Sequence, residues 1–358
     1  MKKIDVYIIK KFLGTFFFAI VLIITIAIVF DFSEKIDNFI EKEAPLSAIF
    51  LDYYLNFIPY FANLFSFLFT FIAVIYFTSR MSNRSEIVAI RASGVSFERF
   101  LRTYFISAFI IAGLSFFLSS YVIPKANETR LQFEDKYIRD HFYYSDRNIH
   151  KQVKPGTFIY MESYNNRIDI GYNFSIEHFE DGQLKRKLMS DYIKWDTTQN
   201  KWRIHNYYIR YIDGMNERIE KGARKDTTLR IKPKEFKRRV NFVETMTLGQ
   251  LNDYIEEQRL RGNSQLENFL IEKHKRVAFP FSTFILTVIG AAVASRRVKG
   301  GTGMHIGLGI ALSFTYILFM QVSFQFAING SMSPLLAVWV PNIIFGIIAL
   351  ILYYTTPK

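Results

Sequence analysis

The sequence contains no cysteine and only six histidines, and both shortages narrow its chemistry. Without cysteine there is no disulfide, no thiolate zinc or iron–sulfur site and no cysteine nucleophile. The histidines include no i, i+4 pair of the kind that holds a metal ion on a helix. The sequence also lacks the G-x-x-x-x-G-K-[ST] loop that binds ATP and the G-x-S-x-G elbow of hydrolases. We therefore expect no metal, no cofactor and no catalytic residue in this chain.

Charged residues are missing from six long apolar segments. Residues 12–30 contain no ionisable side chain, and at about 1.5 Å per residue a helix of this length crosses an apolar core of about 30 Å. The other five segments have the same character, with only His305 at one end of the fifth, and they cover 53–78, 104–123, 277–295, 304–328 and 335–354. We predict six membrane-spanning helices. Ion-coupled carriers usually hold charged residues at membrane depth, so the sequence disfavours that class.

The formal charge of +13 is concentrated at one set of segment ends. The two termini, with the loops that join spans two to three and four to five, hold 13 Lys and Arg against three acids. The loop 31–52 holds two bases against six acids. The positive-inside rule then predicts that both termini are cytoplasmic and that residues 124–276 lie outside. Because the excess charge has this explanation, we expect no nucleic-acid partner.

The external segment is rich in β-type runs. In 202–212, Trp202 and Ile204 share one face of a strand, whereas Tyr207 and Ile209 continue on the other parity, and a bulge near Asn206 would keep both sets inward. The predicted strands cover 157–162, 168–179, 184–195, 202–212 and 227–231. Turn residues such as those at 181–182 and 213–214 separate several of them. This spacing indicates an antiparallel β-jelly roll or sandwich.

The predicted fold is an α-helical polytopic membrane protein with six helices (3+3) and an inserted periplasmic antiparallel β-jelly-roll domain. Its first three spans occupy 1–123 and include a cytoplasmic helix at about 84–93. The β-domain covers 124–246, two re-entry helices cover 247–276, and spans four to six cover 277–358. The first re-entry helix opens on a capping box formed by Thr247 and Gln250.

The cytoplasmic helix is amphipathic and short. Ile87 and Ile90 share its apolar face, and Glu86 and Arg91 are available to a partner. A cap precedes the helix and Gly94 ends it. Spacing alone leaves two interpretations open, namely docking into a soluble protein or lying on the membrane surface.

A ridge of small residues marks the fifth apolar segment. Gly303, Gly307 and Ala311 recur at a spacing of four, so they lie on one face of a helix. Such a ridge permits close approach of another helix, and it is common in membrane proteins.

The run Ser85-Glu-Ile-Val-Ala-Ile-Arg-Ala-Ser-Gly94 resembles the signature of the lipopolysaccharide-export permeases, the LptF/LptG family. Residues 4–13, 187–202, 246–251 and 275–280 are also similar to this family, in the same order along the chain. The resemblance implies the transmembrane subunit of an ABC exporter in a Gram-negative inner membrane. Its implied partners are a cytoplasmic ATPase dimer, a second permease that is a paralogue or a copy of this chain, a periplasmic jelly-roll bridge protein and lipopolysaccharide.

The residues expected to carry this function fall into three groups. The first contacts the ATPase, the second lines a lipid path, and the third packs a lateral gate between the first and fifth spans. The family's acidic coupling residue matches Glu86, whereas the family's base at the outer end of span one is matched here only by Lys35. The three groups are Glu86, Ile87, Ile90 and Arg91; Lys35, Trp202, Ile204, Tyr207 and Ile209; and Gly303, Gly307 and Ala311.

Two other classes of protein remain open. In a mechanotransmission-type ABC subunit the β-domain would move a periplasmic partner and no lipid would cross. In a membrane anchor with a periplasmic binding module no ATPase would associate at all. Lipid within the β-domain separates the export permease from the mechanotransmission subunit, and ATPase association separates the export permease from the anchor.

Overall fold

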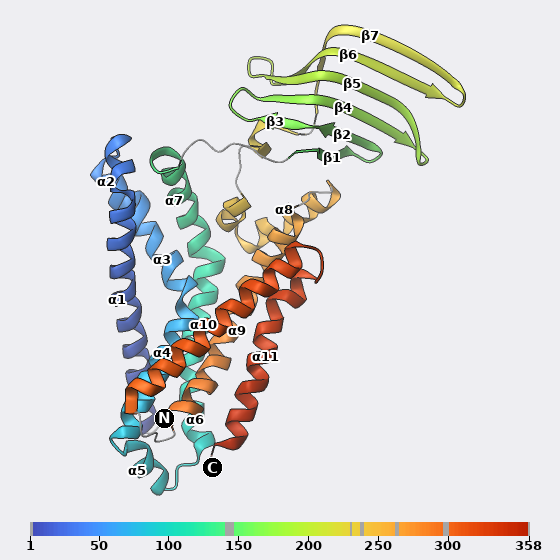
Figure 1. The fold of residues 1–358 in the computed structure, drawn as a ribbon. Coiled ribbons are helices and arrows are strands. Elements are labelled where there is room, and N and C mark those ends of the chain that lie inside the picture. Colours follow the sequence, from blue (N-terminus) through green and yellow to red (C-terminus); the bar gives the residue numbers. More distant parts are fainter. Residues whose placement is uncertain are drawn as a thin grey trace. The chain divides into compact units, whose positions relative to one another are not determined.

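The computed structural model describes residues 3–139, 147–229, 231–236, 240–261, 265–295 and 301–356 (Figure 1). Backbone contacts divide the chain into two compact units. The helical unit comprises Met1–Ile138, Val243–Leu251 and Glu267–Lys358, and the β unit comprises Arg139–Phe242 and Asn252–Leu266. Two halves of one helical unit are therefore separated in the sequence by a unit of different structure.

The helical unit provides six candidate membrane spans. Five are single helices, or helices continued through a π-helical turn, and the sixth is a bent pair formed by α2–α3 and α4. Its first half contains α1 (Lys3–Glu41), α2 (Leu46–Ala48), η1 (Ile49–Tyr54), α3 (Leu55–Leu64), α4 (Ser66–Asn83), α5 (Glu86–Ala92), α6 (Phe97–Phe117), η2 (Leu118–Val122) and α7 (Ile123–Tyr137). Its second half contains α9 (Leu266–Ala294), α10 (Gly301–Ile328) and α11 (Pro334–Thr355). The predicted combination of six spans with an inserted antiparallel β-domain is confirmed.

The predicted second span is broken rather than continuous. α3 and α4 meet at an angle of 60° at Phe65, and α3 contains Pro59, a residue typical of bent helices. Just before the break, Asn63 Oδ1 accepts a hydrogen bond of 2.6 Å from Ser115 Oγ of α6. Hydropathy reports only the apolar character of a segment, so it did not reveal the bend.

Close packing against α4 depends on glycine. A Cβ atom at Gly290 of α9 would lie 2.9 Å from Val74 Cγ1 and 3.1 Å from Phe71 Cδ2, both in α4. A Cβ atom at Gly309 of α10 would lie 2.5 Å from Ile75 Cδ1, which also belongs to α4. Two helices therefore approach α4 more closely than any larger residue would permit.

The β unit contains one antiparallel sheet with the strand order β1-β2-β4-β5-β6-β7, and β3 also pairs with β4. The strands are β1 (Ile149–Lys154), β2 (Thr157–Met161), β3 (Ser163–Asn165), β4 (Ile170–Glu180), β5 (Gln183–Asp196), β6 (Lys201–Asp213) and β7 (Asn216–Thr227). Sequential strands are neighbours, so the described strands form a meander in one sheet (Figure 1). The 3₁₀ turns η3 (Pro233–Phe236) and η4 (Val240–Thr245) follow it, and then α8 (Leu248–Leu260) begins.

Two details of the sequence-based strand assignment are corrected. β1, β3 and β7 were missed. Among the described residues of the strand predicted at 227–231, only Thr227 belongs to a strand, because β7 ends there; residue 230 lies outside the described residues. β7 is an edge strand with mostly exposed, charged residues, so it lacks the apolar alternation that signals a strand. The capping box is confirmed: Thr247 N donates to Gln250 Oε1 at 3.0 Å, and Gln250 N donates to Thr247 Oγ1 at 3.4 Å.

We predict that Gly290→Ala destabilises the protein by about 1–3 kcal/mol, because the added methyl group overpacks the contact with α4. The matched control is Gly113→Ala in α6, where no described atom lies within 4 Å of the new Cβ. The control should gain about 0.5–1 kcal/mol from helix propensity. Thermal unfolding in detergent measures both variants, and equal midpoints would contradict the prediction.

Candidate functional site

α5 lies at the end of the helical unit that also carries both termini (Figure 1). Ser85, immediately before the helix, has a left-handed φ of 59°, and Gly94, after it, has φ of 84°. Gly94 N donates to Arg91 O at 3.0 Å, so glycine ends the helix as predicted. The two reversals separate α5 from α4 and α6 as a distinct short helix.

The apolar side of α5 faces the helical unit. Ile87 is 4% exposed and Ile90 is half-buried, and both pack against residues of α1, α4 and α6. These two side chains therefore seat the helix and present little surface to a partner. Val88, at 63% exposed, is the outward apolar side chain, and the sequence analysis missed it. The i, i+3 spacing defined the apolar face without showing which way that face points.

Glu86 and Arg91 are each half-buried. Tyr7 Oη of α1 donates a hydrogen bond of 3.1 Å to Glu86 Oε2, so the carboxylate joins α5 to the first helix. Ile87, Val88 and Arg91 also border a surface hollow next to α5. The structure thus places two of the four predicted coupling residues, Ile87 and Arg91, at one hollow. It connects Glu86 to α1 and packs Ile90 against the helical unit.

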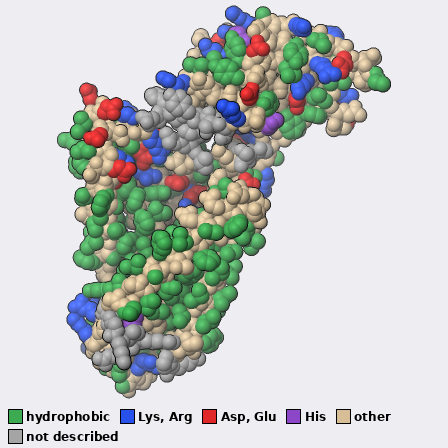
Figure 2. Space-filling view, viewed as in Figure 1, with side chains coloured by type: hydrophobic (Ala, Val, Ile, Leu, Met, Phe, Trp, Pro, Cys, Tyr) green, Lys and Arg blue, Asp and Glu red, His purple; other side chains and the backbone are tan. Residues whose placement is uncertain are grey.

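The small-residue ridge of α10 faces outward. Gly303, Gly307 and Ala311 are all exposed, and no described atom lies within 4 Å of a Cβ built at either glycine. The opposite face of α10 packs inward, where His305 Nδ1 lies 2.9 Å from Ser79 Oγ of α4. Figure 2 shows hydrophobic side chains along the flank of the helical unit and charged ones toward its ends. The ridge is therefore a surface that another helix or lipid can contact.

Lys35 is engaged inside the helical unit. Its ammonium group forms an ion pair with Asp31 and donates to Tyr53 Oη, and it lies 5.1 Å from the centre of the Tyr53 ring. Asp31 also accepts from Tyr54 Oη at 3.2 Å. The pairing with Asp31 neutralises the positive charge that a lipid phosphate would need.

The predicted lipid-path residues of β6 lie in the core of the β unit. Trp202, Ile204 and Ile209 are each at most 1% exposed, and Tyr207 packs at the margin of the same cluster. Trp202 Nε1 donates to Ile231 O at 2.9 Å. These side chains line the inner face of the sheet, where other residues of this chain cover them.

A crease crosses the sheet and explains how both parities of β6 point inward. Asn148, Asn173 and Asn206 have positive φ values of 54°, 48° and 50°. The strand register aligns them in one row with Glu162 and Asp191. Asn206 Nδ2 donates to Asp191 Oδ2 at 2.9 Å, and Asn173 Nδ2 donates to Glu162 Oε2. Asparagine tolerates the left-handed conformation because its side chain bonds locally.

The crease differs from the predicted bulge. Pairing of β5 with β6 runs from Tyr192↔His205 to Ser190↔Tyr207 without a register shift, so β6 has no extra residue. Instead, the alternation of inward and outward side chains changes parity at one residue of each strand. The residues at which it changes are paired with one another across neighbouring strands. The prediction that Trp202, Ile204, Tyr207 and Ile209 all point inward is therefore correct. The prediction that a β-bulge near Asn206 causes this is wrong.

We predict that Asn206→Val destabilises the β unit by about 1–3 kcal/mol, because a β-branched residue is strained at positive φ. Asn206→Gly loses the same hydrogen bond to Asp191 but adopts this φ freely. The glycine variant should therefore stay within about 1 kcal/mol of wild type. Denaturant unfolding followed by tryptophan fluorescence compares the two, and equal losses would show that the bond, rather than the backbone, matters.

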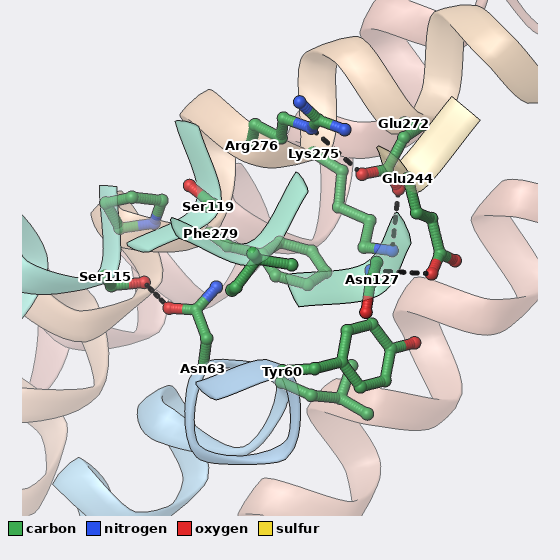
Figure 3. Close-up of a pocket in the computed structure, with 13 residues that line it drawn as sticks. Tyr60, Asn63, Ser115, Ser119, Asn127, Glu244, Glu272, Lys275, Arg276 and Phe279 are labelled. Atoms are coloured by element: carbon green, nitrogen blue, oxygen red, sulfur yellow. Dashed lines mark hydrogen bonds and ion pairs between the residues drawn. The ribbon is translucent and has the colours of Figure 1, made fainter. Parts of the chain in front are cut away.

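A buried ionic cluster lies where the chain re-enters the helical unit (Figure 3). Arg276 donates to Met246 O at 2.6 Å, to Val243 O at 3.1 Å and to Glu272 Oε1 at 3.1 Å. Lys275 Nζ lies 3.0 Å from the other oxygen of Glu272. No role for this cluster followed from the sequence, although the i, i+3 and i, i+4 spacing of its charges on one helix is visible there.

Glu244 completes the cluster from η4. Its carboxylate accepts from Asn127 Nδ2 at 3.4 Å, and Arg130 lies 4.3 Å from the ring centre of Tyr60 beside it. Burial, followed by the nearby Glu272 carboxylate, raises the pKa of Glu244. The adjoining cavity has a volume of about 50 Å³, which is room for a few water molecules but not for an acyl chain.

These features define a polytopic membrane protein whose helical unit carries an inserted β-sheet unit. The chain matches the family model described as Lipopolysaccharide export system permease LptF/LptG over residues 6–355, and it belongs to that family. Members of this family are non-catalytic permease subunits of the Lpt ABC system, which implies a partner permease and an ATPase. The protein is accordingly an integral inner-membrane permease subunit. No curated protein matches the chain significantly.

We predict that Glu244→Gln stabilises the protein more at about pH 8 than at about pH 5. A raised pKa means that this carboxyl supports folding fully below its ordinary value of 4.5, and that the support is lost as pH rises through the folded-state pKa. Glutamine is neutral at every pH and removes this loss. Thermal unfolding measures the effect, with the exposed Glu256→Gln as control. A shift that is the same at both pH values would contradict the prediction.

Proposed function

We propose that this chain is the transmembrane subunit of an ABC exporter that extracts lipopolysaccharide from the inner membrane. In this proposal a separate cytoplasmic ATPase dimer supplies the energy, and a periplasmic jelly-roll bridge receives the lipid. The family match over residues 6–355 is the observation that carries it. Each CH₂ group withdrawn from the membrane costs about 0.8 kcal/mol, so a lipid with several acyl chains needs an external energy source.

The proposed orientation follows from charge. Both termini and α5 lie in the cytoplasm, because the loops at that end hold 13 Lys and Arg against three acids. Residues 124–276 then lie in the periplasm, with the β-sheet between α7 and the re-entry helices of 247–276. Spans one to three lie in 1–123 and spans four to six in 277–358.

α5 is the proposed contact with the ATPase. Glu86 and Arg91 supply its charged contacts, and Ile87 and Ile90 hold it against the helical unit. The hydrogen bond from Tyr7 to Glu86 gives a direct route by which movement of α5 reaches α1. α1 is one of the two helices assigned to the lateral gate.

The proposed lateral gate uses the exposed ridge of α10. Gly303, Gly307 and Ala311 allow a helix of the second permease, a paralogue or another copy of this chain, to approach closely. Lipopolysaccharide enters when this contact opens.

The inner face of the sheet is the proposed lipid path beyond the gate. It requires the sheet to separate from the residues covering Trp202, Ile204, Tyr207 and Ile209, because all four belong to its packed core or margin. Lys35 contributes to lipid binding only if the Asp31 pair opens.

A mechanotransmission subunit that moves a periplasmic partner without moving lipid is the alternative. The inner face of the sheet favours it, because described residues of this chain already pack against the side chains that acyl chains would contact. A photoreactive lipopolysaccharide separates the two: crosslinks to β6 during ATP turnover support export, and their absence supports mechanotransmission.

We predict that Glu86→Ala folds and inserts normally but releases at least about tenfold less lipid per ATP hydrolysed than the wild-type protein. Its carboxylate is the proposed charged contact with the ATPase. The measurement is coupled release from liposomes that contain the permeases and their ATPase. Glu98→Ala is the control, since its exposed carboxylate at the same end pairs with Arg102. Unchanged coupling in the Glu86 variant would refute the assignment.

A further inference from the structure

A cationic hollow lies on the sheet face opposite the packed core. Tyr192, Lys194, Arg203, His205 and Arg224 line a surface cavity of about 390 Å³, and Trp195, Asp196 and Thr197 complete its lining. This volume falls in the range of small-ligand sites. The hollow belongs wholly to the β unit and includes none of the predicted lipid-path residues.

The strand register places these side chains on one face. Tyr192, His205 and Arg224 are directly opposite one another on β5, β6 and β7. Lys194 and Arg203 form the row two residues further along, so they point to the same side. The rings of Tyr192 and His205 stack at 4.5 Å with an interplanar angle of 12°. Side chains from three strands therefore place positive charges around the stacked rings of Tyr192 and His205.

The positive charge of the hollow is only partly balanced. Arg203 forms ion pairs of 2.9 Å with Asp196 and 3.0 Å with Asp226. Lys194 and Arg224 form no ion pair with a described acid. Burial, and then Arg224, Arg203 and Lys194 in that order, lowers the pKa of His205, while Asp226 opposes them. Like charges facing each other across strands destabilise a sheet, so this arrangement costs stability unless an anion joins it.

We propose that this hollow binds a phosphate monoester. Arg224 offers a planar fork of donors that matches phosphate oxygens, Lys194 adds a point charge, and His205 lies between them. A simpler explanation is that charges on β7 protect an exposed sheet edge from pairing. Edge protection, however, gives no reason for Lys194 on the interior strand β5 to converge on the same point.

The test measures the ionisation of His205 in the full-length protein in nanodiscs by NMR of labelled histidine rings. Inorganic phosphate is compared with chloride at equal ionic strength. A phosphate bound beside the imidazole should raise the pKa of His205 by about one unit. His178, which pairs across β4 and β5 with Arg186, is the internal control and should not respond. An unchanged pKa of His205 would overturn the proposal.

Two variants of equal charge distinguish a specific phosphate site from general electrostatic attraction of phosphate to the protein. Arg224→Gln and Lys225→Gln each remove one positive charge from adjacent positions of β7 that face opposite sides. Arg224→Gln should weaken phosphate binding about tenfold or more, and Lys225→Gln should leave it nearly unchanged. Equal weakening by both variants would mean that only the overall charge matters and would overturn the proposal.

Two further probes identify the source of the phosphate. Glucose 1-phosphate represents a soluble monoester, and lipopolysaccharide, intact or dephosphorylated, represents a lipid-borne one. A response to both soluble phosphates but not to the intact lipid supports a soluble ligand. A response to the intact but not the dephosphorylated lipid supports a lipid-borne ligand. The choice of this second probe rests on the proposed function, but the measurement follows ionisation rather than transport, so its failure leaves the export proposal standing.

Discussion

The helical unit depends on the buried guanidinium of Arg276, at the point where the chain returns to the unit. Arg276, with its side chain 4% exposed, binds Glu272 of its own helix and the carbonyl groups of Val243 and Met246. A buried guanidinium is tolerated only when its donors are paired, and loss of one partner from such a pair typically costs about 3–5 kcal/mol. The contact fixes the re-entering chain to α9, and Glu244 of the same segment accepts a hydrogen bond from Asn127 of α7 in the first half of the unit.

In the helical unit, the charges paired within the chain and the surfaces left exposed lie on different elements. Charges at the re-entry end are paired within the chain, as for Asp31 with Lys35 and Glu272 with Arg276. The flank of α10 instead exposes a small-residue ridge, and α5 turns Val88 outward while Ile87 holds it in place. A permease subunit that works with a second permease and an ATPase requires this division, because its partners contact surfaces while its own helices keep their arrangement.

Much of the fold was predictable because its signals are local. Uncharged runs marked the spans, and Thr247 with Gln250 marked a helix start. What was missed depends on partners distant in sequence or on geometry that composition does not record. Arg276 binds carbonyl groups 30 and 33 residues away, β7 carries the polar residues of an edge strand, and the reversal at Asn206 requires a matching row in neighbouring strands. The outward direction of Val88 was undecidable, since spacing gives a face but not its orientation.

We propose that the chain moves lipopolysaccharide together with an ATPase and a second permease. Affinity purification from native membranes in mild detergent, with mass spectrometry of proteins and lipids, tests it most directly. We expect an ATPase, a second permease and lipopolysaccharide to co-purify with the chain. Recovery of an ATPase and a periplasmic protein without lipid, or of no ATPase at all, would contradict it.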